Sequence, residues 1–154
     1  MKDIKISQAT LEDRPQLVKF FKHYQDQELI ENRLNFHAAN KSTIIAKDQD
    51  KLVGIIQWLV KEDPRAGVAE LEELFVLEEY RGIGVGAELI KHVLRIIKDY
   101  FEERNIKPRK VYLFVAKENV AAQKLYEKFG FKYLAMMPNI FSDDRMEFVY
   151  CLDL

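Results

Sequence analysis

The stretch VLEEYRGIGVGAELI, residues 76–90, places three glycines within the six residues 81–86. The 154-residue chain has only six glycines, so half of them lie here. The apolar segment VAELEELFVL precedes the glycines, and after them apolar residues recur at spacings of three and four. This pattern predicts a strand, a glycine-rich turn and a long amphipathic helix from Gly84 to about Arg104.

Such a turn is suited to binding an anion through its main-chain N–H groups. Glycine tolerates positive φ and lets a ligand approach the backbone closely. The first N–H groups of a helix have no intrahelical acceptor, and the helix dipole favours negative charge beside them. We therefore predict a phosphate-binding turn from about Gly82 to Ala87.

Two common nucleotide motifs do not fit the turn. The P-loop pattern needs a Gly-Lys pair, and the chain contains none. The dinucleotide pattern G-x-G-x-x-G, started at Gly82, needs a third glycine where the chain has Ala87. The pattern that remains is Arg81-x-x-Gly84-x-Gly86. On this stretch alone, a helix-start turn with incidental glycines stays an alternative.

The segments on either side extend the prediction to the whole chain. DIKISQA alternates like a strand, Thr10 opens a helix with a loose capping box to Asp13, and a second helix spans about 27–39. STIIAKDQDKLVGIIQWLVKED predicts two strands about the turn DQD. The later segments predict a strand at VYLFVA, a helix at NVAAQKLYEKFG, and strands at FKYLAMM and RMEFVYCLDL. The order βααβββαβαββ predicts one α/β (α+β) domain, residues 1–154, with a mixed sheet and flanking helices.

Composition narrows the class of protein. The formal net charge of −1 argues against a general nucleic-acid binder. No apolar run reaches the roughly 18 residues of a membrane span, and the N-terminus lacks a signal-peptide pattern. With Cys151 as the only cysteine, no internal disulfide can form. We expect a cytoplasmic protein, and the spacing of its histidines predicts no metal site.

A second segment, NVAAQKLYEKFGFK, strengthens the interpretation of the turn. Asn119 is a good N-cap, Tyr126 follows two helical turns later, and Gly130 ends the helix before a strand. Together with ELEELFVLEEYRGIGVGAELI, this segment resembles the GNAT superfamily of acyl-CoA-dependent N-acetyltransferases. The two motifs span about residues 70–131, and the element order extends the resemblance to the whole chain.

The resemblance implies a mostly antiparallel sheet in which a central pair of strands splays apart and holds acetyl-CoA. It also implies which residues contact that co-substrate. They are Leu74, Phe75, Val76, Arg81, Gly82, Ile83, Gly84, Val85, Gly86, Ala87, Asn119, Ala122 and Tyr126. An N–H group around Leu74–Val76 would polarise the thioester carbonyl. Plain N-capping is the alternative role for Asn119.

Two side chains are candidates for proton transfer. Tyr126 would protonate the departing CoA thiolate, because a phenol keeps its proton at neutral pH; a tyrosine packed on the core is the alternative. By position, Glu72 resembles the glutamate that some family members use as a base, through water. Glu73 faces the other side of the strand, and Glu70 on the face of Glu72 is the fallback.

The acceptor implied by the resemblance is an amine: a small amine, a polyamine, or a lysine or N-terminal amine. The family shapes this side of the site with its first two helices and the loop between its last two strands. Here these segments offer aromatic and acidic residues, which could equally be a solvated rim. A CoA-binding module without turnover and a nucleotide-binding α/β domain are the competing functions. The resemblance also allows a homodimer.

Overall fold

The computed structural model describes residues 3–61 and 63–154, which form two compact units interleaved along the chain. Unit 1 contains the chain up to Trp58 and residues Glu73–Val93; unit 2 contains Leu59–Glu72 and Leu94–Leu154. Strand β4 (Val68–Val76) begins in unit 2 and ends in unit 1. Helix α3 (Val85–Glu102) begins in unit 1 and ends in unit 2.

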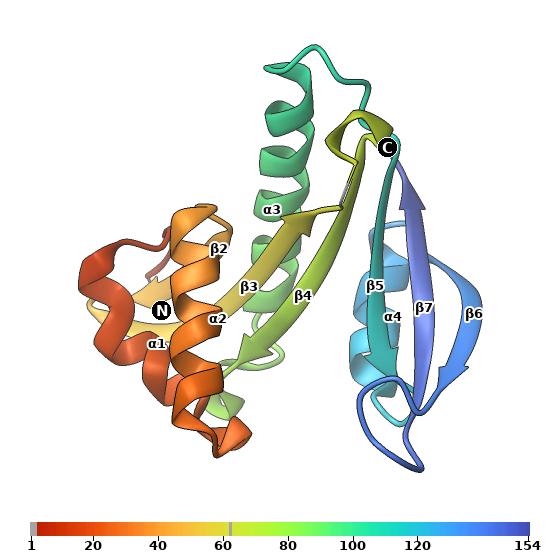
Figure 1. Ribbon diagram of the computed structural model, residues 1–154. Helices are drawn as coiled ribbons and strands as arrows, with labels where there is room; N and C mark the ends of the chain where they lie inside the picture. Colours follow the sequence, from red (N-terminus) through yellow and green to blue (C-terminus); the bar gives the residue numbers. More distant parts are fainter. Residues whose placement is uncertain (1–2, 62) are drawn as a thin grey trace. The chain divides into compact units, whose positions relative to one another are not determined.

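Unit 1 is built on strands β1, β2 and β3 and the end of β4. Antiparallel ladders join β1 to β2 and β2 to β3. In Figure 1, helices α1 and α2 lie over one face of these strands, and the first half of α3 lies over the other. The bounds are β1 Ile4–Gln8, η1 Leu11–Asp13, α1 Arg14–Phe20, η2 Lys22–Tyr24, α2 Gln27–Ala39, β2 Thr43–Asp48, β3 Lys51–Val60 and η4 Glu78–Tyr80.

One hydrophobic core cluster of unit 1 lies between α1, α2 and the strands. Leu17 and Phe21 from the first helical segment meet Ile30 and Leu34 of α2 and Ile55 of β3. The hairpin of β2 and β3 turns at 49–50, as the sequence predicts. Of the apolar residues that the sequence suggests for α2, however, Leu29 and Phe36 are 47% and 51% exposed. Only one stripe of α2 packs on the sheet, so helical spacing overestimates its buried face.

Unit 2 contains the first half of β4, the second half of α3 and the C-terminal strands. β4 pairs in parallel with β5 (Lys110–Ala116) over Val68–Leu71 and Lys110–Leu113. β5 and β6 (Lys132–Pro138) both pair antiparallel with β7 (Met146–Asp153). Helix α4 (Val120–Lys128) lies on one face of these strands (Figure 1). The short helix η3 (Pro64–Ala66) ends at Gly67, which has φ +67°.

The predicted fold class is confirmed. The strand order is β1-β2-β3-β4-β5-β7-β6, mostly antiparallel with a parallel pair β4–β5, and the predicted order of helices and strands matches along the chain. The single-domain assignment stays a prediction. Trp58 of β3 is 4% exposed and belongs to the core.

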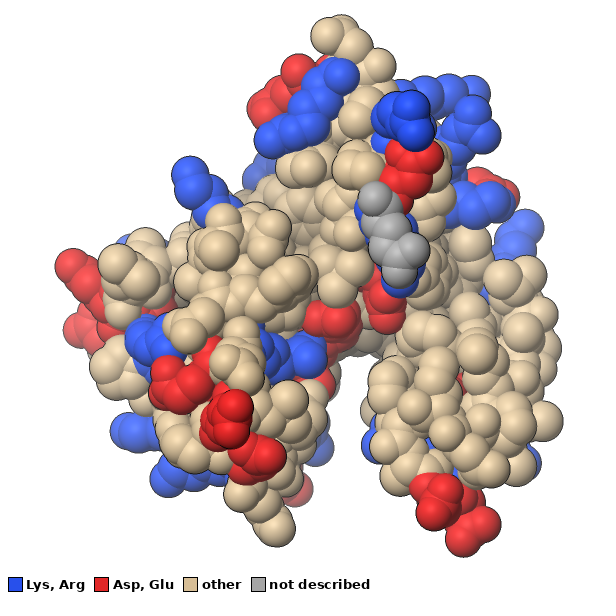
Figure 2. All heavy atoms as spheres, viewed as in Figure 1, with Lys and Arg blue, Asp and Glu red and all other residues tan. Residues whose placement is uncertain are grey.

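The edge strand β6 is the most exposed apolar element of unit 2. Six large apolar side chains between 133 and 141 are exposed: Tyr133, Leu134, Met136, Met137, Ile140 and Phe141. In Figure 2, uncharged side chains dominate the visible surface around β5–β7, whereas acidic and basic ones intermix over α1 and α2. A β-bulge at 133–135 and Pro138 interrupt the edge, features that limit pairing with further strands.

Candidate functional site: a glycine turn at the start of α3

The predicted anion site lies in unit 1, between η4 and α3. Gly82 and Gly84 have φ of +75° and +94°, values that favour glycine. A Cβ built on either would meet no atom within 4 Å, so both face open space. The turn therefore combines a backbone that needs glycine with room for a ligand beside it.

The first turn of α3 supplies the hydrogen-bond donors. Its first backbone bond runs from Glu88 N to Gly84 O at 3.0 Å. The N–H groups of residues 85–87 precede that bond and have no intrahelical acceptor, as at every helix start. They are placed to bind an anion, and the helix dipole adds a positive potential.

Contacts with the end of β4 and with β2–β3 hold the turn in place. Arg81 Nε donates to Val76 O at 3.0 Å, and its guanidinium carbon lies 5.8 Å from the centre of the Phe75 ring. Tyr80 is 7% exposed and donates its hydroxyl hydrogen to Asp48 at 2.9 Å. The structure thus brings together the predicted residues Leu74–Val76 and 81–87.

Gly54 of β3 is a part of this arrangement that the sequence analysis did not single out. A Cβ at Gly54 would lie 3.1 Å from a methyl carbon of Leu89, 3.3 Å from Phe75 O and 3.3 Å from Val85. A Cβ at this position would force its neighbours to move by a few tenths of an ångström, so glycine suits the close approach of β3 to the first turns of α3. The signal was available, because a glycine inside an apolar strand often marks a close approach of the backbone.

Glu73, on β4, belongs to a polar network within unit 1. Its carboxylate accepts a hydrogen bond from the Tyr24 hydroxyl, and Arg33 Nη2 lies 4.0 Å from it. Arg33 also donates from Nε to Gln57 Oε1 at 2.9 Å. Glu73 therefore has a phenol and a guanidinium as neighbours, as expected for a structural carboxylate.

In unit 2, Asn119 caps α4. Its Oδ1 accepts from Ala122 N at 3.1 Å, which confirms the predicted capping role. Gln123, a residue the sequence analysis did not identify, donates from Nε2 to Ala116 O at 3.1 Å and to Lys117 O at 2.9 Å. These bonds tie the start of α4 to the end of β5.

Tyr126 lies on the buried face of α4. It is 4% exposed, and its ring packs edge-on against Phe131 with 5.6 Å between centroids. The chain turns back at Gly130 (φ +88°), where Phe131 N donates to Tyr126 O at 3.3 Å. The packing places the ring firmly, and the proton-donor role of its hydroxyl stays a prediction.

The two carboxylates on the other face of β4 lie in unit 2. Glu70 accepts from the Tyr112 hydroxyl at 2.8 Å, and Lys61 Nζ lies 3.6 Å away. Burial, aided by the negative charge of Glu72, raises the pKa of Glu70 despite these partners. Glu72 is half-buried. A carboxyl group with a raised pKa suits proton transfer, so Glu70 stays open as an alternative to Glu72.

The loop after β6, which the resemblance places on the acceptor side, carries the aromatic residue Phe141. The Phe141 ring meets the Phe114 ring of β5 edge-on, with centroids 5.6 Å apart. The Arg145 guanidinium lies 5.9 Å from the Phe141 ring centre and is ion-paired with Glu147, which is 1% exposed. Phe141 is therefore anchored although it is 59% exposed.

The described residues give three further results. Residues 3–61 and 63–154 contain no group of three or more His, Cys, Asp or Glu side chains able to hold a metal ion. No helix within the same ranges has the length and apolar character to cross a membrane. His37 is buried and lies 2.7 Å from the Ser42 hydroxyl oxygen through Nδ1, and His23 is exposed.

The predicted site residues fall into both units. The glycine turn and Leu74–Val76 belong to unit 1, whereas Glu72, Asn119, Ala122 and Tyr126 belong to unit 2. Within each unit the residues are held by the contacts described above. The class these features define is an α/β protein with a glycine-rich strand–turn–helix anion site.

Comparison with known proteins specifies this class further. The profile of the Acetyltransferase (GNAT) family matches residues 7–131, most of the chain. The chain therefore belongs to the GNAT acetyltransferase family, as the two motifs predict.

Two relatives are named as N-acetyltransferases of different kinds. A spermine/spermidine N(1)-acetyltransferase of Bacillus subtilis is 29% identical over 72 residues, which is 47% of this chain and 44% of that protein. The match thus spans less than half of the Bacillus relative. An N-alpha-acetyltransferase of Sulfurisphaera tokodaii is 26% identical and aligns with 92% of this chain and 88% of its own length.

Solved structures share the fold. The protein yncA of Salmonella typhimurium, determined with its cofactor acetyl-CoA, has a TM-score of 0.78 at 16% identity. That alignment covers 98% of this chain and 94% of the Salmonella protein. At this identity the similarity concerns the fold alone.

Proposed function

We propose that the protein is an N-acetyltransferase that moves an acetyl group from acetyl-CoA to a primary amine. The observation that carries this proposal is the glycine turn, with Gly82 and Gly84 at positive φ beside open space and the N–H groups of residues 85–87 at a helix start. Family membership supports acetyl-CoA as the donor of the group. We further propose that residues 1–154 work as one domain, which the family match over residues 7–131 supports.

Binding would rest on main-chain donors and apolar contacts. The amides of residues 82–87 would hold the diphosphate of CoA, with Arg81 as a nearby cation. Leu74, Phe75 and Val76 are half-buried, which suits contact with the pantetheine arm, and an N–H among them would polarise the thioester carbonyl. Asn119 and Ala122 would contact CoA from the start of α4.

The chemistry requires two proton transfers. A neutral amine attacks the thioester carbonyl carbon, the C–S bond breaks, and the acetyl group ends on nitrogen. Glu72, through a water molecule, would take the proton from the amine, with Glu70 as the alternative. Tyr126 would give its proton to the departing sulfur, and its buried, packed ring supports a fixed orientation.

For the acceptor, the relatives support two kinds of amine: a polyamine and a protein N-terminus. Glu70 and Glu72 lie on one strand face, and the anchored Phe141 adds an aromatic surface elsewhere in unit 2. Carboxylates and aromatic rings both attract cationic amines. We favour the polyamine because it carries several positive charges, and we keep the N-terminal amine as the second candidate.

Thermal shift with acetyl-CoA, CoA, ATP and NAD tests the proposal first. Acetyl-CoA at 100 times its Kd should raise Tm by about 5–10 °C for a chain of this size. CoA should act similarly, whereas ATP and NAD should not. Stabilisation by ATP or NAD alone would contradict the proposal. Thiol release with spermidine and with a peptide N-terminus then separates the two acceptors; binding without release from any amine would favour a CoA-binding module.

The proton-donor role of Tyr126 has its own test. Tyr126→Phe keeps the packed ring and removes the hydroxyl, so we expect kcat to fall by about 100-fold with the acetyl-CoA thermal shift retained. Tyr133→Phe, at an exposed tyrosine of the same unit, is the matched control. An unchanged kcat for Tyr126→Phe across the pH range would show that another group donates the proton.

A further inference from the structure

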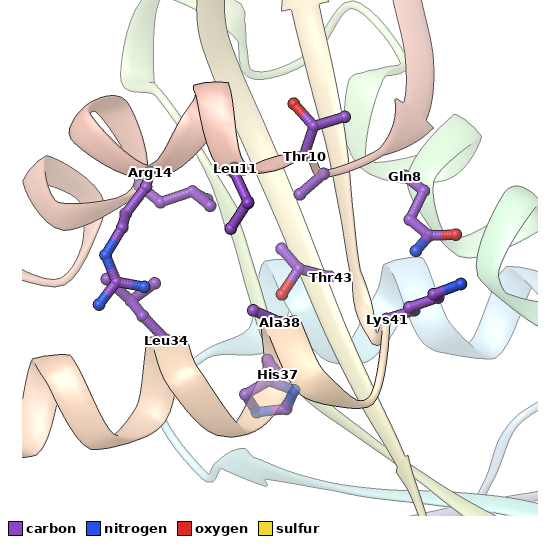
Figure 3. A pocket seen from close by; sticks show the side chains of 11 residues that line it. Gln8, Thr10, Leu11, Arg14, Leu34, His37, Ala38, Lys41 and Thr43 are labelled. Carbon is purple, nitrogen blue, oxygen red and sulfur yellow. The ribbon is translucent and has the colours of Figure 1, made fainter.

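A cavity in unit 1 lies apart from every residue assigned above to acetyl-CoA or to catalysis. It opens between the end of β1, the start of α1 and the C-terminal half of α2 (Figure 3). Its volume is about 210 Å³. That is below the roughly 300–1,000 Å³ of sites for drug-sized molecules, so its size selects a small ligand.

The cavity has apolar walls. Leu17 and Leu34 are core residues, 6% and 4% exposed, and form its inner side. Leu11 is 80% exposed and lies at its mouth, where Figure 3 shows it beside Thr43 and Ala38. An occupant with a short hydrocarbon body would bury part of Leu11 against these walls and gain hydrophobic stabilisation.

The polar groups around the cavity are mainly hydrogen-bond donors and cations. Its lining contains Arg14 and Lys41 but no Asp or Glu. Arg14 is ion-paired with Glu31 and donates to Asn35 at 3.0 Å, so its charge is largely compensated. Lys41, in contrast, forms no ion pair with any residue among 3–61 and 63–154.

Two of the neutral lining groups can also donate hydrogen bonds. Thr43 is 5% exposed, and its Oγ1 accepts from Gln57 Nε2 at 3.0 Å, which leaves the hydroxyl hydrogen to donate. Gln8 can donate through its side-chain amide, and Figure 3 shows Gln8 next to Lys41 at one end of the cavity. An anionic group at that end would meet an unpaired ammonium and an amide.

We propose that this cavity binds a small monocarboxylate with an unbranched or branched hydrocarbon body of about five carbons. The carboxylate lies at the Lys41–Gln8 end, and the hydrocarbon lies against Leu11, Leu17 and Leu34. The uncompensated ammonium of Lys41 favours an anionic group, and the apolar walls favour a hydrocarbon body. The site is separate from the glycine turn, so its occupation does not depend on acetyl-CoA.

Methyl NMR with three five-carbon probes tests this assignment on the whole chain. Pentanoate should shift the methyl signals of Leu11, Leu17 and Leu34 saturably, whereas pentanol and pentylamine, with the same body, should bind at least about tenfold more weakly. Equal binding of pentanoate and pentanol would show a merely apolar hollow. Absence of saturable shifts with pentanoate would overturn the proposal.

A pair of lysine variants tests whether Lys41 supplies the positive charge that binds the carboxylate. Lys41→Met should weaken pentanoate binding by about tenfold, the loss of one charge-assisted hydrogen bond. Lys19→Met, at an exposed lysine of α1 outside the cavity lining, is the matched control and should leave the Kd unchanged. Equal Kd values for both variants would overturn the role of Lys41. Both positions are exposed, so neither substitution removes a core contact.

Discussion

At the residue scale, Gly84 couples backbone conformation to ligand access. Gly84→Ala puts a Cβ on a residue at φ +94°, which strains the turn by about 1–2 kcal/mol and fills the open space beside it. We expect Tm to fall by a few degrees and the acetyl-CoA thermal shift to be lost. Tm and the ligand-induced shift are both read from one melting experiment.

Gly130 provides a matched control for the strain alone. It has φ +88° at the end of α4, and a Cβ there would lie 3.4 Å from Leu152, an ordinary contact. Gly130→Ala should therefore lower Tm by a similar amount yet keep the acetyl-CoA shift. If both variants keep the shift, the glycine turn does not bind the co-substrate.

Glu70 gives a pH-dependent prediction. Its folded-state pKa is raised, so its contribution to stability is greatest below about pH 4.3 and is lost as pH rises through the folded-state pKa. Glu70→Gln removes the buried charge and keeps an acceptor for Tyr112. We expect its Tm relative to the wild type to be higher at pH 7 than at pH 4. Glu118→Gln, at an exposed residue, is the control; a pH-independent difference for Glu70→Gln would refute this account.

At the element scale, Asp13 joins the first helical segment to β2. It is 2% exposed, lies 2.5 Å from Lys47 Nζ and accepts from Thr10 N at 2.7 Å. Burial acts to raise the pKa of Asp13, but the bonds from Lys47 and Thr10 outweigh it and the net pKa is lowered. The stability that Asp13 contributes is therefore present above about pH 3.9 and is lost as pH falls through the folded-state pKa.

We expect Asp13→Asn to cost about 1–3 kcal/mol at pH 7, because Lys47 loses its partner and the amide fits this set of donors poorly. Urea unfolding at pH 7 and at pH 3 measures the cost, which should shrink at the lower pH. Glu12→Gln, its exposed neighbour, should change stability by no more than about 0.5 kcal/mol. A cost for Asp13→Asn that is equal at both pH values would contradict the linkage.

At the scale of the whole molecule, the proposed function predicts that CoA protects two segments that are distant along the chain. The glycine turn belongs to unit 1, and the start of α4 belongs to unit 2. Saturating CoA should slow hydrogen exchange at residues 82–88 and also at residues 119–123, since a bound ligand suppresses local opening around it. Protection confined to one unit would mean that the predicted site residues do not share a ligand.

Much of the fold follows from local pattern. Alternation in DIKISQA, the capping signals at Thr10 and Asn119, and the 3–4 spacing after Gly84 predict elements that the structure contains. The glycine turn is equally local, because a strand, three glycines and a helix start are contiguous in the chain. Family motifs at 81–86 and 119–131 depend on the same short-range spacing.

The contacts of the β4 carboxylates, in contrast, do not follow from local sequence pattern. Two glutamates of β4 acquire different partners: Glu73 meets Tyr24 and Arg33, while Glu70 meets Tyr112 and Lys61. These contacts join Glu73 to a residue 49 positions away and Glu70 to one 42 positions away. No local pattern encodes them.

The sequence by itself thus determined the order of elements, the glycine turn and the family, because hydrophobic period, capping and backbone freedom act over a few neighbouring residues. The tertiary structure alone decided which carboxylate is buried, why a glycine suits position 54, and where Lys41 borders a cavity. Those properties arise from strand register and helix packing, which bring together atoms that are distant along the chain.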